Sequence, residues 1–412
     1  MNKSPRLVAL ETLYSIFYDG SYSNIALDKA LSDIKENKAF ISALVYGVTE
    51  RKITLDYFID KYAQGRIKPK VRIVLWLGVY QLLFMDKVPS SASINESVKL
   101  VKEIKQDYYS KLVNAVLHKI DNDRQIPDDL SVKYSVPENL INMWKKQYGE
   151  DVLNEFLPCI NDKPPLFAIP NKKFVNSDEL LYELECDGIL GEAYDEFVLI
   201  ENANDLTDSK AFKNGLFYIE DLSSFNCANA LDALGDDLVL DMCSAPGGKA
   251  FTISQSMNNS GKIYCYDLHE HRLNLIKNSA KRLSIDNIYT DVNDATVYNE
   301  NIPKADKILC DVPCSGFGII RRKPEIRYKD LDSVKDLPQI QYKILETSSR
   351  YLKDGGRIIY STCTLNKKEN ENVVNKFLKD HSGYKLLKEK TVFPSTVGGD
   401  GFYYAIMVKN EN

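Results

Sequence analysis

The sequence is poor in the patterns that build metal sites and disulfide scaffolds. Its eight cysteines form no C-x-x-C pair, and its four histidines do not fall at the spacings of zinc ligands. The first ten residues are polar and charged, so a secretory signal peptide is not expected. Without secretion, a disulfide scaffold is implausible in a chain of 412 residues. We therefore expect no metal, cysteines that are mostly buried as small hydrophobic residues, and a cytoplasmic protein.

Long hydrophobic runs are also missing. The most apolar stretch spans residues 71–85 and contains Arg72 and Gln81, whereas a membrane-spanning helix needs roughly 20 apolar residues. This stretch is predicted to be a buried core helix, and no association with a membrane is expected. The length of the chain predicts two or three domains.

Positive charge is not in excess. The net charge is −5 and the pI is about 5.6, which argues against a large basic surface that covers nucleic acid. The charge is uneven, however, because residues 1–130 hold 19 Lys and Arg against 16 Asp and Glu, a net +3, and the remainder carries −8. Any surface that binds RNA must therefore be local.

The first part of the chain, residues 1–130, is predicted to be all-helical. The apolar residues of segment 7–17 recur at helical spacing, and similar stretches follow after short polar breaks. The acidic segment 121–129 contains Pro127 and is typical of a linker. Further helices are expected over residues 41–48, 71–85, 93–105, 111–120 and 137–157.

From about residue 238 the pattern changes to short β-branched runs that alternate with helical stretches. The alternation predicts βαβ units and a Rossmann-like, doubly wound, mostly parallel sheet with helices on both faces. The expected strands are 238–241, 262–267, 288–291, 307–311, 357–361 and 403–408, and the expected helices between them include 271–283, 339–352 and 369–381.

A glycine-rich turn follows the first of these strands. The run Leu238-Val-Leu-Asp-Met-Cys-Ser-Ala-Pro-Gly-Gly-Lys249 predicts a strand, a tight turn and a helix that begins near Lys249. Glycines let the backbone approach a ligand closely, and a helix N-terminus favours negative charge. The run is not a P-loop, because Ala250 stands where that motif needs Ser or Thr, and it lacks the G-x-G-x-x-G dinucleotide pattern.

Acidic residues follow the next two strands. Asp267 ends the second strand, where a carboxylate can accept hydrogen bonds from ribose hydroxyls, and Asp294 follows the third, where it can accept from an adenine amino group. Either residue alone would be interpreted as a solvated loop residue. Beside the glycine-rich turn, the two predict a nucleoside site.

Two cysteines follow the fourth and fifth strands. Cys314 lies in Asp311-Val-Pro-Cys-Ser-Gly316, and Cys363 lies in Tyr360-Ser-Thr-Cys-Thr364. If these strands are adjacent, both thiols lie at the rim of one crevice, at the edge where open α/β sheets bind ligands. Their Asp, Ser and Thr neighbours favour a catalytic role over simple packing.

Two thiols and a carboxylate suit methylation of a pyrimidine at carbon 5. That carbon is a poor nucleophile until a thiolate adds to carbon 6, which makes carbon 5 enamine-like and able to attack a methyl sulfonium. Asp311 is the candidate for a carboxyl group near N3 of cytosine, where it would stabilise the charge that develops during the attack.

These motifs closely resemble those of the NOL1/NOP2/Sun family of RNA cytosine-5 methyltransferases. The resemblance implies that Cys363 is the nucleophile, that Cys314 helps to release the product and that S-adenosyl-L-methionine is the cofactor. The run 321–327, Arg-Arg-Lys-Pro-Glu-Ile-Arg, also matches, and its place beside the crevice favours contacts with RNA phosphates. The implied cofactor residues are Cys243, Ser244, Ala245, Pro246, Gly247, Gly248, Lys249, Asp267, Asp294 and Asp311, and the RNA-binding candidates are Arg321, Arg322, Lys323 and Arg327.

The N-terminal half resembles the NusB-type helical RNA-binding domain. Such a domain fused to this catalytic core is the arrangement of bacterial 16S rRNA methyltransferases. The resemblance implies a NusB-like domain over 1–130, a small α+β connecting module over 131–215 and an S-adenosylmethionine-dependent methyltransferase domain over 216–412. The matching segments are Leu44–Arg51, Leu75–Leu83, Val88–Glu96 and Lys111–Leu117.

The expected function is methylation of carbon 5 of one cytosine in 16S rRNA, naked or in early assembly, by a monomer. The same chemistry on tRNA or large-subunit rRNA is an open alternative, because the catalytic motifs do not separate the substrates. A second alternative is a non-catalytic RNA-binding assembly factor. The complete set Lys249, Asp311, Cys314 and Cys363 favours the enzyme.

Overall fold

The computed structural model describes residues 3–202, 206–394 and 398–411. Contacts divide the chain into two compact units. The helical unit consists of residues 1–162 and 320–329, and the sheet unit consists of residues 163–319 and 330–412. Of the expected connecting module 131–215, residues 131–162 fall in the helical unit and residues 163–215 in the sheet unit.

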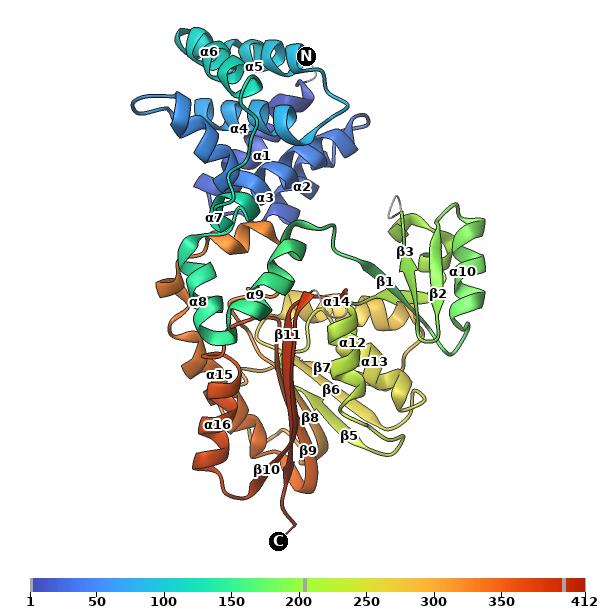
Figure 1. Cartoon of the computed structure of the whole chain (residues 1–412). Coiled ribbons are helices and arrows are strands. Elements are labelled where there is room, and N and C mark those ends of the chain that lie inside the picture. Colours follow the sequence, from blue (N-terminus) through green and yellow to red (C-terminus); the bar gives the residue numbers. More distant parts are fainter. Residues whose placement is uncertain (1–2, 203–205, 395–397, 412) are drawn as a thin grey trace. The chain divides into compact units, whose positions relative to one another are not determined.

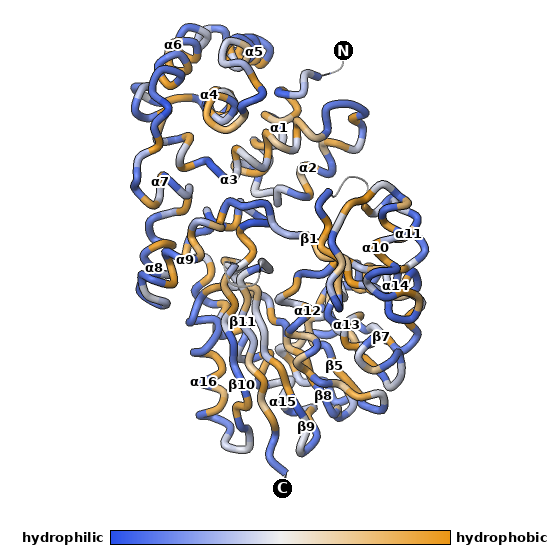
Figure 2. The backbone as a smooth tube through the Cα atoms, turned by 45° about the vertical axis from the view of Figure 1, so that its right-hand side comes forward, coloured by the Kyte–Doolittle hydropathy of each residue, from blue (hydrophilic) through white to orange (hydrophobic). Residues whose placement is uncertain are grey.

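The helical unit is built around helix α4, Pro69–Phe84 (Figure 1). Ten residues of α4 are buried, and its tube is largely in the hydrophobic colour in Figure 2. A helix that is apolar all round must be surrounded by other helices, as the sequence predicted. The others are α1 (Pro5–Tyr18), α2 (Ser23–Leu31), α3 (Lys38–Tyr62), α5 (Ser90–Glu103), α6 (Ser110–Asp121), α7 (Leu130–Tyr134), α8 (Glu138–Tyr148) and α9 (Glu150–Phe156), with short 3-10 turns at Asp107–Tyr109, Leu157–Asn161 and Pro324–Tyr328.

The prediction of one helix over 137–157 is wrong. The segment forms two helices, α8 and α9, which meet at Gly149 with a φ of 90°. Glycine adopts this left-handed conformation without steric cost, so it ends α8 and redirects the chain.

The sheet unit begins with a small antiparallel sheet in the order β2-β3-β1-β4. It packs its own hydrophobic core around Ala168, Leu180 and Phe217. Its strands are β1 (Leu166–Pro170), β2 (Gly191–Tyr194), β3 (Phe197–Ile200) and β4 (Phe217–Ile219), and it is accompanied by α10 (Ser177–Cys186), α11 (Lys210–Lys213) and a turn at Leu206–Asp208.

The larger sheet has seven strands in the order β10-β11-β9-β8-β5-β6-β7 (Figure 1). The five strands from β9 to β7 are parallel; β11 runs antiparallel to β9, and β10 at the edge runs antiparallel to β11. This confirms the predicted Rossmann-like fold. The strands are β5 (Leu238–Asp241), β6 (Lys262–Asp267), β7 (Ile288–Val292), β8 (Ala305–Asp311), β9 (Leu352–Thr362), β10 (Tyr384–Val392) and β11 (Phe402–Lys409).

Both faces of this sheet are covered, because successive strand residues point to opposite sides. Val239, Leu309 and Ile359 join one core cluster with helices α12–α14, whereas Leu240 and Ile308 join another with α15 and α16. The covering helices are α12 (Leu222–Asn229), α13 (Gly248–Ser256), α14 (Glu270–Arg282), α15 (Leu337–Ser349) and α16 (Glu371–Asp380), with a short turn at Leu331–Val334.

Strand β10 was not predicted. It lies at the edge of the sheet, and its sequence, YKLLKEKTV, contains three lysines. Charged edge strands lack the apolar pattern of central ones, since one side of their backbone faces no partner strand. Among the described helices, none is long and apolar enough to cross a membrane.

Candidate active site

The candidate site lies at the carboxyl ends of β5 and β8. These strands are parallel neighbours, and the chain order reverses between them, which is where open α/β sheets bind ligands. Asp241 ends β5 and Asp311 ends β8. Both carboxylates line a cavity of about 360 Å³ together with most of the 243–249 turn. A larger cavity of about 1210 Å³ lies in the helical unit against α1 and α2 and contains none of the predicted site residues.

The glycine-rich turn takes the form that its sequence predicts. Gly247 has a φ of 109°, and a Cβ there would lie 2.8 Å from the ring of Phe251. Helix α13 then begins at Gly248, so its free N–H groups face the cavity edge. A Cβ on Gly248 would lie 3.0 Å from Oε1 of Glu220, which shows how closely the backbone approaches this carboxylate.

Lys249 connects the turn to the end of β8. Its Nζ lies 2.8 Å from Oδ2 of Asp311 and 5.3 Å from the ring centre of Phe402. Although burial opposes it, the carboxylates of Asp311 and Glu220 raise the pKa of Lys249. Ser361 donates to the other Asp311 oxygen at 2.8 Å, so Asp311 is held from two sides.

Two buried carboxyl groups face the same cavity. Burial raises the pKa of Glu220 to about 7, opposed by Lys249, and burial raises the pKa of Asp241 to about 7. Both Asp241 oxygens are buried and lack a hydrogen-bond partner among the described residues, although Ser244 and the backbone of Cys243 are near enough to oppose the rise of its pKa. A buried carboxylate without a partner is costly, so the cavity is prepared for a cationic or hydrogen-donating ligand.

The two other predicted cofactor acids lie farther along the same edge. Asp267 ends β6, is 4% exposed, and pairs with Arg272 at 3.0 Å between Oδ2 and Nη1. Asp294 is exposed and accepts from the amide and hydroxyl of Thr296 at 2.9 and 2.6 Å. Exposed apolar side chains of Leu268 and Val297 line an open depression with Asp294.

The two predicted catalytic cysteines meet. The Sγ atoms of Cys314 and Cys363 are 3.2 Å apart, and both residues are partly exposed. The hydrogen bond to Cys363 and burial raise the pKa of Cys314 well above its ordinary value. The protonated form of Cys314 is therefore favoured, and either sulfur can donate in this contact.

The loops that carry the cysteines are joined by buried hydrogen bonds. Oγ of Ser315 lies 2.7 Å from Oγ1 of Thr364, and the amide of Phe317 donates to the same Thr364 oxygen at 3.2 Å. The carboxylate of Glu369 accepts from the amide and hydroxyl of Ser315 at 2.9 and 2.6 Å, and from Gln341 at 3.0 Å. These contacts fix the distance between the two sulfurs.

A close backbone crossing lies beside this pair. The amide of Gly318 donates to the carbonyl of Cys363 at 3.1 Å, and the amide of Gly401 donates to the carbonyl of Gly318 at 2.9 Å. A Cβ on Gly318 would lie only 1.9 Å from the oxygen of Gly401. Glycine is therefore required at this position.

Other cysteines behave as small core residues. Cys227, Cys265 and Cys310 are fully buried, and burial raises the pKa of each. Cys243 lies in the turn beside the cavity, where burial raises its pKa well above the ordinary value. These thiols are protonated, which suits packing or hydrogen bonding rather than nucleophilic attack.

The basic run 321–327 differs from the prediction at its end. Arg327 is 1% exposed, and its Nη1 donates to the carbonyls of Glu50 at 2.9 Å and Ser135 at 3.2 Å. A side chain that is enclosed and bonded in this way cannot reach a phosphate, so the expected RNA contact of Arg327 is wrong. Arg321 is 7% exposed, whereas Arg322 and Lys323 are half-buried.

The sequence interpretation missed two functional candidates, Glu220 and Glu369. Glu220 directly follows strand residues Phe217–Ile219. An acidic residue at the end of a strand is the signal that predicted Asp267, so the same signal could have found Glu220. Glu369 carries no such signal, because only the folded structure brings it to Ser315. Among the described residues, no group of His, Cys, Asp and Glu is arranged to hold a metal.

Comparison with known proteins shows to which family the chain belongs. Residues 228–408 match the family described as 16S rRNA methyltransferase RsmB/F, and residues 3–122 match the NusB family. Over 98% of its length the chain is 33% identical to the probable ribosomal RNA small subunit methyltransferase B of Bacillus subtilis (strain 168), of which 99% is covered. The chain belongs to the RsmB/F family.

Two further relatives span the whole molecule. The ribosomal RNA small subunit methyltransferase B of Photorhabdus laumondii is 28% identical, with 98% of each chain covered. The crystal structure of PH0851 is similar with a TM-score of 0.83 and 27% identity, over 99% of this chain and 100% of that one. The NusB-like helical domain and the methyltransferase domain of the RsmB/F architecture are thus both present.

The cofactor of this RsmB/F member is S-adenosyl-L-methionine, and the residues present fit it. The unpartnered carboxylate of Asp241 suits a positively charged group. The φ of Gly247 lets backbone amides face a ligand, and the exposed Leu268 and Val297 beside Asp294 suit the faces and edge of an adenine ring.

Proposed function

We propose that this protein methylates carbon 5 of a cytosine in 16S rRNA through a covalent bond between Cys363 and carbon 6 of the base. The observation that carries the proposal is the 3.2 Å separation of the sulfurs of Cys314 and Cys363, which follow the neighbouring strand ends at Asp311 and Ser361. A protonated thiol next to a second thiol is the arrangement that a nucleophile and its proton-handling partner require.

S-adenosyl-L-methionine supplies the electrophilic methyl group when it is bound. The turn 243–249 would hold it by backbone amides, and Asp241 would face its positive charge. Asp267 and Asp294 would accept from its ribose hydroxyls and adenine amino group, since each ends or follows a strand at the same edge of the sheet.

The attack on the base uses Cys363 and Asp311. Cys363 loses its proton to solvent, its thiolate bonds to carbon 6, and the electrons of the carbon 5–carbon 6 double bond become available at carbon 5. Asp311, held by Lys249 and Ser361, would stabilise a proton at N3 of the cytosine. Ser361 precedes Cys363 by two residues, so one strand end positions both groups.

Release of the product uses Cys314. Once the sulfur of Cys363 is bonded to carbon, it no longer accepts the hydrogen of Cys314, and Cys314 can lose its proton to solvent. Its thiolate then takes the proton from carbon 5. The electron pair of that C–H bond restores the ring double bond, the carbon 6–sulfur bond breaks, and Cys363 leaves as a thiolate.

The names of the relatives support small-subunit rRNA as the substrate. The NusB-like domain favours the same substrate, because such helical modules bind RNA. The target base must leave its helix to reach a sulfur at the rim of the sheet, as in other enzymes that modify bases.

The deciding experiment compares wild-type protein with Cys363→Ala on unmodified 16S rRNA and methyl-labelled cofactor. We expect labelled 5-methylcytosine with wild type, none with Cys363→Ala, and nearly equal cofactor affinity by calorimetry, because the thiol contacts the base. Cys186→Ala, at an exposed cysteine of α10, is the control and should label normally. Parent-like turnover by Cys363→Ala would defeat the proposal, and absence of label with wild type would favour an assembly factor.

A further inference from the structure

One segment of the helical unit comes from late in the sequence. Residues 320–329, here called the strap, leave the sheet unit after Ile319 and return to it at Asp330. The strap includes the 3-10 turn Pro324–Tyr328. It contains the basic run 321–327, which the sequence predicts to contact RNA, yet three of its side chains make contacts inside the helical unit.

Glu325 caps a helix that has no cap of its own. Helix α2 begins at Ser23, and Tyr22, its N-cap residue, makes no side-chain capping bond. The Glu325 carboxylate accepts from the amide of Ser23 at 3.2 Å and from its hydroxyl at 2.7 Å. A carboxylate at a helix N-terminus satisfies free N–H groups and opposes the positive end of the helix dipole.

Arg327 donates hydrogen bonds to oxygen atoms, two of which lie at the ends of helical segments. Besides Glu50 and Ser135, its Nη1 donates to Oδ1 of Asn161 at 2.8 Å. Ser135 is the C-cap of α7, and Asn161 ends the turn after α9. The guanidinium therefore pairs with oxygens at the ends of α7 and of the turn after α9, where a cation is favoured, and with one carbonyl within α3. Burial lowers the pKa of Arg327, and Glu50 partly opposes this.

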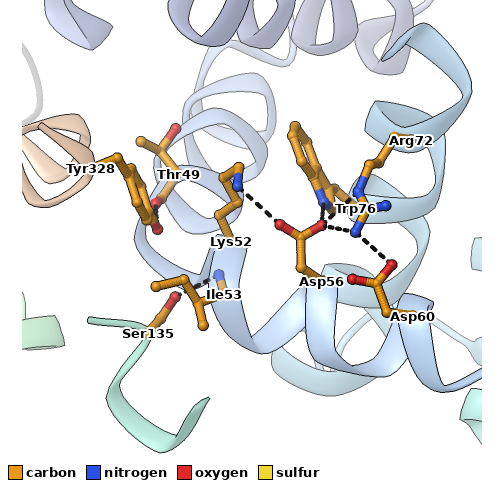
Figure 3. A network of polar contacts seen from close by, with 9 residues as sticks. All are labelled: Thr49, Lys52, Ile53, Asp56, Asp60, Arg72, Trp76, Ser135 and Tyr328. Atoms are coloured by element: carbon orange, nitrogen blue, oxygen red, sulfur yellow. Dashed lines mark hydrogen bonds and ion pairs between the residues drawn. The ribbon is translucent and has the colours of Figure 1, made fainter. Parts of the chain in front are cut away.

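Tyr328 completes the attachment, as Figure 3 shows beside helix α3. Its hydroxyl donates to the carbonyl of Thr49 at 2.7 Å, and its ring centre lies 5.4 Å from Nζ of Lys52. Lys52 also pairs with Asp56 at 2.9 Å, and Asp56 accepts from Trp76 at 2.7 Å. The strap thus ends in a network that extends across α3 to α4.

The other end of the strap is close to the catalytic cysteines along the chain. Gly318, two residues before the strap begins, donates to the carbonyl of Cys363 and accepts from Gly401. Cys314 precedes Gly318 by four residues. The strap and the crossing that joins the two cysteine loops are therefore adjacent along the backbone.

We propose that the strap lets the NusB-like helical domain restrain the loop of Cys314, and that Arg327 and Tyr328 are positioning residues for product release. The inference rests on the proposed function, because it assigns the release step to Cys314. Loss of the restraint should misplace Cys314 relative to carbon 5 while Cys363 still forms its bond, so the covalent protein–RNA adduct should accumulate.

The test measures adducts that survive denaturing electrophoresis, together with turnover, on 16S rRNA and labelled cofactor. Arg327→Met should lower turnover on the order of 10- to 100-fold, the range for a misplaced catalytic group, and raise the adduct fraction. Tyr328→Phe and Ser23→Ala, which each remove hydroxyl contacts only, should show the same effect more weakly while the protein remains folded. Should Arg327→Met fail to fold, these two milder variants decide.

Asp60→Asn is the matched control. Asp60 pairs with Arg72 in the same network and does not contact the strap, so its variant should form no excess adduct. Cys314→Ala is measured in parallel and should accumulate adduct. If it does, the inference is overturned when both milder variants turn over like wild type, or when their turnover falls without any excess adduct. Absence of adduct with Cys314→Ala counts against the proposed function itself and removes the basis of the inference.

Discussion

The sulfur atoms of Cys314 and Cys363 lie 3.2 Å apart although 49 residues separate them in the sequence. They meet because β8 and β9 are adjacent parallel strands, so the loops after both strands leave the same edge. The two thiols are not equivalent, because their contact and burial raise the pKa of Cys314.

Removing the Cys314 thiol should stall the enzyme after methyl transfer. In Cys314→Ala nothing takes the proton from carbon 5, so Cys363 stays bonded to the base and a protein–RNA adduct survives denaturation. Electrophoresis with labelled RNA measures it, and the double variant with Cys363→Ala should form none. If Cys314→Ala forms no adduct on its substrate, the roles of the two cysteines are reversed or the mechanism is different.

Stability without cofactor should fall as the pH rises from about 4 to 7. Burial raises the pKa of Asp241 from 3.8 to about 7, so the folded protein holds a proton that the unfolded chain releases. The contribution is fully present below the unfolded value and lost as the pH passes the folded one. Asp241→Asn should therefore gain about 2–3 kcal/mol of unfolding free energy, relative to wild type, between pH 5 and 7.

Urea unfolding at the two pH values measures this difference, and Asp236→Asn, at an exposed acid, should show none. Affinity for the cationic cofactor should move the other way and increase towards pH 8, because the ionised carboxylate attracts it. A pH-independent difference between wild type and Asp241→Asn would show that the carboxyl is already ionised in the folded protein.

Glu369 should be needed as a carboxylate. It accepts from Ser315, Gln341 and Asn366, so every neighbouring group donates. Glu369→Gln places an amide N–H₂ against these donors, and the variant should lose about 1–3 kcal/mol of unfolding free energy. Turnover should fall as well, because the loops of both cysteines lose their common support. Unchanged turnover would show that Thr364 alone holds the loops.

The backbone crossing at Gly318 should not tolerate a methyl group. Gly318→Ala would place Cβ 1.9 Å from the oxygen of Gly401, so the backbone must shift and turnover should fall with a destabilisation of about 1–3 kcal/mol. Gly383→Ala is the control, since no atom lies within 4 Å of its Cβ position. Equal behaviour of the two variants in thermal unfolding and turnover would contradict the close crossing.

Much of the fold could be predicted from the sequence because its signals are local. Strands β5, β6 and β8 are predicted by short apolar runs that end at Asp241, Asp267 and Asp311. The ends of these strands define the edge of the sheet where ligands bind. The break at Gly149 and the lysine-rich edge strand β10 were missed, because a glycine within a helical pattern and a charged strand each give a weak signal.

The site was predictable only where a motif contained it. Glu369 and Glu220 are buried among groups distant in sequence, and burial is what gives their carboxylates a role. The RNA contact predicted for Arg327 was wrong because the sequence of a basic run does not show whether its side chains face solvent or bind buried carbonyl groups.

The late arrival of the strap has a consequence for synthesis on the ribosome. The chain completes residue 162 about 160 residues before it reaches residue 320, which at 5–20 residues per second is a wait of roughly 10–30 s. During that time the start of α2 lacks Glu325, and the carbonyl ends of α7 lack Arg327. The nascent helical domain thus lacks its last ten residues until the ribosome has translated the segment that contains Cys314 and the strap.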